Sequence, residues 1–158
     1  ALEARVGIIG SADTASLTYR IATLEGTGVS STAWATYTPT WTGASSNPAI
    51  GDGTIAGRYK VIGKTLFLHI AITMGASTTY GSGGWSLSLP GSYTTAAAFA
   101  VVNGTAYRTN HSPITWVFGG AGSSTGGMYA SGGVVSATAP ITFATSDLLL
   151  LSGSIEVA

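Results

Sequence analysis

The segment RYKVIGKTLFLHIAITM, residues 58–74, decides the fold class of this chain of 158 residues. Its Gly63-Lys64 pair is a two-residue turn of the kind that joins antiparallel strands, so the segment predicts a β-hairpin. In a strand, successive side chains point to opposite faces. The second strand therefore places Leu66, Leu68, Ile70, Ile72 and Met74 on one face and Thr65, Phe67, His69, Ala71 and Thr73 on the other. We expect so long and apolar a strand near the centre of a sheet.

The same period of two predicts further strands on both sides of the hairpin. They are residues 37–42, with Pro39 at an edge or strand end, then 85–89, 99–102, 105–108, 114–118, 133–137, 141–144 and 148–157. Asn103-Gly104 has the composition of a hairpin turn, and the glycines of residues 119–127 suggest a flexible surface loop. About eight short strands joined by glycine-rich turns predict an all-β domain over residues 32–158. We expect a jelly-roll-like antiparallel β-sandwich.

The first 31 residues form a separate segment, since five of the chain's twelve charged residues lie before Gly26. Two apolar seams with the 4,3 spacing of a coiled coil run through it. These seams are Leu2, Val6 and Ile9, and Leu17, Ile21 and Leu24. The two are out of register, so we expect two short helical pieces and then a linker over residues 26–31. They pack either on each other in a trimeric stem or back onto the β-domain of the same chain.

Composition excludes several classes of partner. The six basic residues balance six acidic ones, and charged residues make up 8% of the chain, against about a quarter in typical domains. No basic stripe is present for binding nucleic acid or an anionic membrane surface. The apolar run at Leu148–Leu151 is far shorter than the roughly 20 residues that a membrane span needs. With no cysteine and few charges to keep copies apart, we expect an obligate oligomer without membrane insertion, and the heptad-type seams favour a homotrimer.

No pattern in the sequence predicts catalysis. His69 and His111 share no metal-ligand spacing with a carboxylate, and Gly63-Lys64-Thr65 lacks the glycine spacing and the helix of a phosphate-binding loop. Outside the first segment, Asp52 and Asp147 stand in turns and Glu156 stands near the end of the sequence. We therefore expect no catalytic residues, no metal and no cofactor.

Aromatic residues are the remaining candidates for a binding site, because flat amphipathic rings beside polar groups commonly hold saccharides. Tyr80, Tyr107 and Tyr129 lie in or beside stretches rich in glycine, serine and asparagine. We expect these three tyrosines to stand in loops and to contact a neutral carbohydrate.

Two stretches resemble a known family. YTPTWTGASSNPAIGDGTIAGRYKVIGKTLFLHIAITMG, residues 37–75, is similar to the C-terminal domain of bacteriophage minor tail proteins and tail fibres. PITFATSDLLLLSGSIEVA, residues 140–158, resembles that family's ending, in which a proline, an aromatic residue and an aspartate precede a last strand. Here these are Pro140, Phe143 and Asp147. ALEARV at the start is similar to the short coiled coil that often precedes such domains, whereas residues 94–135 have no match.

The resemblance implies a trimeric, jelly-roll-like domain at the tip of a viral appendage. Its implied role is attachment to the host surface, with other tail proteins joined through the N-terminus and the protein located in the virion. No ligand residue carries over from the family. Together with the uncharged stretches around the three tyrosines, the resemblance makes host cell-surface polysaccharide the expected partner. Two alternatives stay open: a purely structural virion protein, such as a head fibre, capsid decoration or baseplate spacer, and a fragment of a depolymerase.

Overall fold

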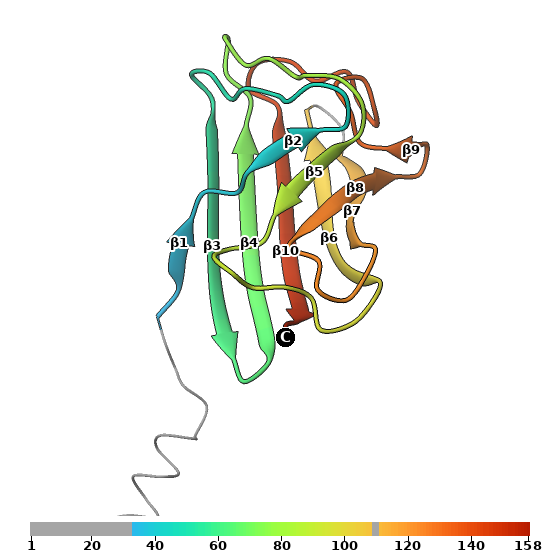
Figure 1. Cartoon of the computed structure of the whole chain (residues 1–158). Helices are drawn as coiled ribbons and strands as arrows, with labels where there is room; N and C mark the ends of the chain where they lie inside the picture. The colour runs from blue at the N-terminus through green and yellow to red at the C-terminus, as the bar shows by residue number, and fades with distance from the viewer. Residues whose placement is uncertain (1–32, 109–110) are drawn as a thin grey trace, which may run out of the picture. The chain divides into compact units, whose positions relative to one another are not determined.

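The computed structural model describes residues 33–108 and 111–158, which form ten β-strands (Figure 1). The strands are β1 Ala35–Tyr37, β2 Trp41–Gly43, β3 Thr54–Ile62, β4 Thr65–Thr73, β5 Trp85–Ser88, β6 Ala100–Tyr107, β7 His111–Phe118, β8 Thr125–Ala130, β9 Gly133–Val134 and β10 Leu148–Glu156. These residues contain no helix, and therefore no helix that could cross a membrane. The all-β prediction is thus confirmed. The predicted stem, with its seams and the boundary at residue 31, lies outside the described residues.

All ten strands belong to one antiparallel sheet, in the order β1-β3-β4-β10-β6-β7-β8-β5-β2, with β9 beside β8. Its two edge strands, β1 and β2, are joined by only three residues around Pro39. Four Cα steps span at most about 14 Å, so the sheet must curl until its edges approach each other. In Figure 1, β2 and β5 accordingly lie across the front of β4 and β10.

The hairpin that decided the fold class is present as predicted. β3 and β4 pair antiparallel around Gly63, whose φ of 59° suits a tight turn. The predicted apolar face of β4 is buried, with Leu66, Ile70 and Ile72 fully enclosed. β4 lies between β3 and β10, so its predicted central position is confirmed.

Aromatic rings fill the space that the curled sheet encloses. Trp41 of β2 and Trp85 of β5 meet edge to face at 4.7 Å, and Phe143 lies 4.9 Å from Trp85. On β7, Trp116 packs against Phe118 at 4.6 Å. Burying these rings removes large apolar areas from water and joins the two halves of the curl.

The predicted turn at Asn103-Gly104 is wrong. β6 runs through both residues, with Asn103 opposite Ser152 of β10 and Thr115 of β7. A Cβ atom on Gly104 would collide with the carbonyl oxygen of Leu150. The glycine therefore allows a close approach of β10, and the chain reverses only after β6 ends at Tyr107.

The predicted loop over residues 119–127 is also partly wrong, because β8 begins at Thr125 and contains both later glycines. Gly126 gives room for the indole of Trp116, whose Nε1 donates a 2.7 Å hydrogen bond to the Gly126 carbonyl. Of the other predicted strands, residues 133–137 are reduced to β9, and residues 141–144 form no strand. The last of these segments instead holds polar contacts of the site described next.

Candidate functional site

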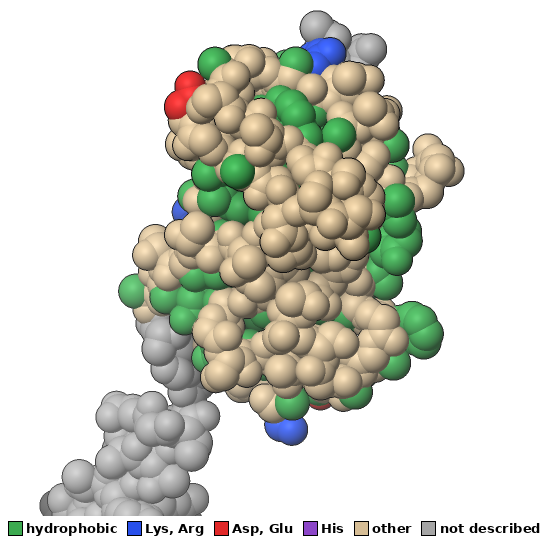
Figure 2. All heavy atoms as spheres, turned by 45° about the horizontal axis from the view of Figure 1, so that its top comes forward, with side chains coloured by type: hydrophobic (Ala, Val, Ile, Leu, Met, Phe, Trp, Pro, Cys, Tyr) green, Lys and Arg blue, Asp and Glu red, His purple; other side chains and the backbone are tan. Residues whose placement is uncertain are grey.

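Three connections gather at one end of the curled sheet, which we call the loop end. They are residues 44–53 after β2, residues 74–84 after β4, and residues 135–147 before β10. Register brings them together, because Thr54, Thr73 and Leu148 lie side by side at this end of β3, β4 and β10. The loop end is at the top of Figure 1 and is turned forward in Figure 2.

Hydrogen bonds tie the first two connections together. The Asp52 carboxylate accepts bonds from the Ser77 backbone N–H at 2.7 Å and from its hydroxyl at 2.8 Å. The Ser77 hydroxyl in turn accepts one from the Asp52 N–H at 2.9 Å, and Ala49 and Thr79 exchange two backbone bonds. The bond from the Ser77 backbone is the main cause that lowers the pKa of Asp52. Asp52 therefore serves to hold these loops in place.

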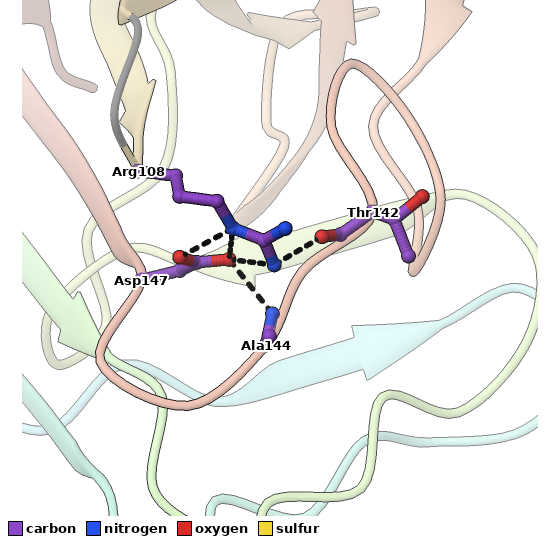
Figure 3. A network of polar contacts seen from close by, with 4 residues as sticks. All are labelled: Arg108, Thr142, Ala144 and Asp147. Atoms are coloured by element: carbon purple, nitrogen blue, oxygen red, sulfur yellow. Dashed lines mark hydrogen bonds and ion pairs between the residues drawn. The ribbon is translucent and has the colours of Figure 1, made fainter.

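An ion pair ties the third connection to the end of β6 (Figure 3). The guanidinium of Arg108 donates to both oxygens of Asp147, at 2.7 to 2.9 Å, and to the Thr142 carbonyl at 2.5 Å. The Ala144 N–H also donates to Asp147, at 2.7 Å. Burial alone would raise the pKa of Asp147, but the bonds from Arg108 and Ala144 and the charge of Arg108 outweigh it, so the pKa is lowered. Both charged groups are thus already engaged.

Two of the three candidate tyrosines belong to the loop end. Tyr80 is half-buried and stacks on Trp85 at 6.3 Å, and burial, with the nearby Asp147 charge second, raises its pKa. Tyr107 is the last residue of β6, directly before Arg108, and its ring is 36% exposed and 4.5 Å from that of His111. The pairing of β10 with both β4 and β6 brings these two tyrosines to the same end.

Tyr129 lies elsewhere. It stands within β8, 45% exposed, opposite Thr115 of β7, whereas Tyr107 lies opposite His111. Four residues along β7 separate these positions by about 13 Å along the strand, and the two tyrosines are also two strands apart. The expectation that all three tyrosines stand in loops is therefore wrong for Tyr107 and Tyr129. The alternation of Met128, Tyr129 and Ala130 was the signal for a strand.

The two histidines do not meet. His69 is central in β4 on the side away from the core, and His111 begins β7 at the loop end. Within residues 33–108 and 111–158, no three His, Asp or Glu side chains gather as a metal site would require.

The surface of the loop end is polar and nearly free of available charge. Figure 2 shows mainly backbone and uncharged polar side chains, with acidic and basic groups at its margins. Exposed hydroxyl and amide groups come from all three connections, among them Ser45, Asn47, Thr79, Ser82, Thr142 and Thr145. Such groups both donate and accept hydrogen bonds, which suits a neutral ligand with many hydroxyls.

Comparison of the chain with protein-family models, with curated proteins and with solved structures finds no match in any of the three.

Proposed function

We propose that this chain forms the tip of a trimeric bacteriophage tail fibre or minor tail protein and attaches the virion to the host cell through neutral surface saccharide. In this proposal, residues 32–158 make a jelly-roll-like sandwich, and residues 1–31 make a helical stem that joins other tail proteins. The tip binds without catalysis. The resemblance of residues 37–75 and 140–158 to that family and the all-β fold support this assignment.

The geometry of the loop end carries the proposal. Its three connections come from distant parts of the sequence, yet the Asp52–Ser77 and Arg108–Asp147 contacts hold them in fixed positions. Holding a binding surface rigid before the ligand arrives reduces the entropy lost on binding. Rigid scaffolds commonly carry recognition on such connecting segments.

The ligand class follows from the groups that the loop end presents. Neutral hydroxyls and amides match the hydrogen-bonding groups of a sugar, and the exposed ring of Tyr107 offers a flat apolar surface. The charged groups here are engaged with protein partners, so binding should change little with salt concentration.

The test measures attachment of the labelled full chain to a panel of bacterial cells and to their isolated cell-wall polysaccharides. Tyr107→Ala removes a 36% exposed ring at the loop end, and Tyr129→Ala removes a 45% exposed ring away from it. We expect the first variant to reduce attachment by about fivefold to tenfold and the second to bind like the parent, with both still folded. Equal binding by parent and Tyr107→Ala, or a collapse of binding at moderate salt, would argue against the loop-end saccharide site.

A structural virion protein without a receptor is the second candidate, favoured by the apolar side of the sheet described below. It predicts an assembled protein that binds no cell and no polysaccharide in the panel. Release of reducing sugar from those polysaccharides would instead support a depolymerase fragment.

A further inference from the structure

The first part of strand β10, Leu148–Leu151, is apolar on both sides, whereas Ser152, Ser154 and Glu156 follow on the side away from the core. Leu149 and Leu151 are fully buried in the core, whereas Leu148 and Leu150 point to the opposite side. We call that opposite side of β3, β4, β10 and β6 the outer face; it is turned away from the viewer in Figure 1. A sheet face that meets water normally carries polar residues, and strands apolar on both sides are typical of sheets covered on both sides.

The apolar character continues across neighbouring strands. Leu150 lies opposite Ala71 of β4, which in turn lies opposite Ala56 of β3. Leu148 lies beside Leu150 on the same side of β10, whereas Phe67 stands further along β4 and is separated from Ala71 by His69. Leu148, Leu150, Ala71 and Ala56 together form a continuous apolar area, in contrast to the single apolar residues scattered over most surfaces.

The outer face is not flat but carries two hollows. One hollow of about 460 Å³ lies over β4, β10 and β6, between His69, Asn103, Thr105 and Leu150. A second hollow of about 290 Å³ lies over β3 and β4, beside Ala56 and Ala71. His69 lines both, so its side chain forms a ridge between two hollows. A ridge flanked by hollows can interdigitate with side chains of a facing protein surface, as close packing at stable interfaces requires.

The charges of this face match a second copy of the same chain. Of the described charged residues, Arg58 and Lys60 lie on β3 and Glu156 lies two strands away on β10. In a pair of copies, Glu156 of one copy can therefore meet Arg58 and Lys60 of the other. Within the part of the chain that the structure describes, these few charges form no cluster of the kind that binds nucleic acid.

The size of the face is also sufficient. β3, β4 and β10 are each nine residues long, and with β6 they make an area about 30 Å by about 19 Å. This footprint of roughly 570 Å² exceeds the roughly 500 Å² per partner that a specific interface needs, although it is smaller than the standard size of roughly 800 Å².

We infer that the outer face is the surface through which copies of this chain assemble. This inference rests on the assembly part of the proposed function and not on host attachment. Leu148 and Leu150 are its apolar centre, and His69 fits between side chains of the neighbouring copy.

The test measures the mass of the full chain by light scattering at micromolar concentration. Leu150→Asp places an uncompensated carboxylate in each contact, which should weaken assembly by roughly a hundredfold or more. The double variant Leu148→Thr/Leu150→Thr keeps a high preference for strands and removes only the apolar groups, so it should fold and also assemble more weakly. Ser86→Asp is the control, since it adds the same charge to β5 on the other side of the curl.

An oligomeric parent, an oligomeric Ser86→Asp variant and dissociated outer-face variants with an unchanged β-sheet circular dichroism spectrum would support the inference. A monomeric parent would overturn it, as would outer-face variants with the parent's mass. An oligomer that dissociates as expected but binds no host cell would leave the interface standing and remove host attachment.

Discussion

Tyr37 carries a hydroxyl that costs stability. Its ring lies over Gly57 and meets Tyr59 edge to face at 5.7 Å, so the ring itself packs well. The hydroxyl oxygen, however, is buried without a hydrogen-bond partner among the described residues. Burial also raises the pKa of Tyr37 above its ordinary value, because the phenolate would lose its hydration.

We predict that Tyr37→Phe raises the free energy of unfolding by about 1 kcal/mol, because an unsatisfied buried hydroxyl is removed and the ring is kept. The gain should widen above pH 10. There the unfolded parent ionises at Tyr37 while the folded parent cannot, so the parent loses stability with rising pH. Urea unfolding at neutral and alkaline pH measures both effects, with the exposed Tyr107→Phe as the control. A less stable Tyr37→Phe variant would mean that the hydroxyl has a partner.

Asp147 should make stability depend on acidic pH. Its pKa is lower in the folded chain than in the unfolded one, so the unfolded chain takes up the proton first as pH falls. The contribution of Asp147 is therefore complete above about pH 4 and is lost as pH falls below that value.

Asp147→Asn removes this contribution. We expect the free energy of unfolding to fall at neutral pH by an amount at the lower end of about 1–3 kcal/mol, because the Arg108 side chain is 40% exposed. Between neutral pH and pH 3, the variant should then lose less stability than the parent loses. Thermal unfolding at the two pH values measures the difference. Lys64→Gln, in the exposed turn between β3 and β4, is the control for the loss of a charge, and a loss equal to that of Asp147→Asn would contradict the assignment.

At the scale of elements, the parts that could be predicted from the sequence are those governed by local rules. The hairpin of β3 and β4 depends on its own turn and its own alternation, and β5 and β10 also show clear alternation or apolar runs. The glycines of β6 and β8 could not be interpreted locally. Their roles are set by Leu150 and Trp116, which are distant in the sequence, and an Asn-Gly pair has the same composition whether it turns or continues a strand.

In the candidate site, too, some features follow from local sequence and others depend on contacts between distant residues. The sequence offered Tyr80 and Tyr107 as candidates by residue type and surroundings. Their common position at the loop end depends on β10 lying between β4 and β6, which no local pattern reveals. The outer face was missed, although the apolar run Leu148–Leu151 was its signal.

Gly104→Ala tests the close approach of β6 and β10. The added methyl group would meet the carbonyl of Leu150, so we expect a loss of about 2–3 kcal/mol on denaturant unfolding. Gly132→Ala is the matched control, since a Cβ atom there meets nothing within 4 Å. Equal stability of the two variants would show that the strands are not so close.

At the scale of the whole molecule, the predicted trimer depends on two surfaces, the outer face and the seams of residues 1–31. If Leu17, Ile21 and Leu24 form an intersubunit seam, Ile21→Asp buries one uncompensated charge per copy and should lower both the mass in solution and the melting temperature. Thr23→Asp, off the seam, should change neither. A parent-like Ile21→Asp variant would show that this seam is not at an interface.

The position of β10 has a consequence for how the protein is made. β10 joins β4 to β6, so the sheet cannot be completed until residues 148–156 have left the ribosome. Until then, the β3–β4 hairpin has an open edge, and β6, β7 and β8 have no connection to it through hydrogen bonds. Pairing strands so far apart in sequence is slow, typically milliseconds to seconds for all-β domains of high contact order. During that interval the nascent chain presents unpaired edges to its neighbours on a polysome, so chaperones that shield strand edges should raise the yield of folded protein.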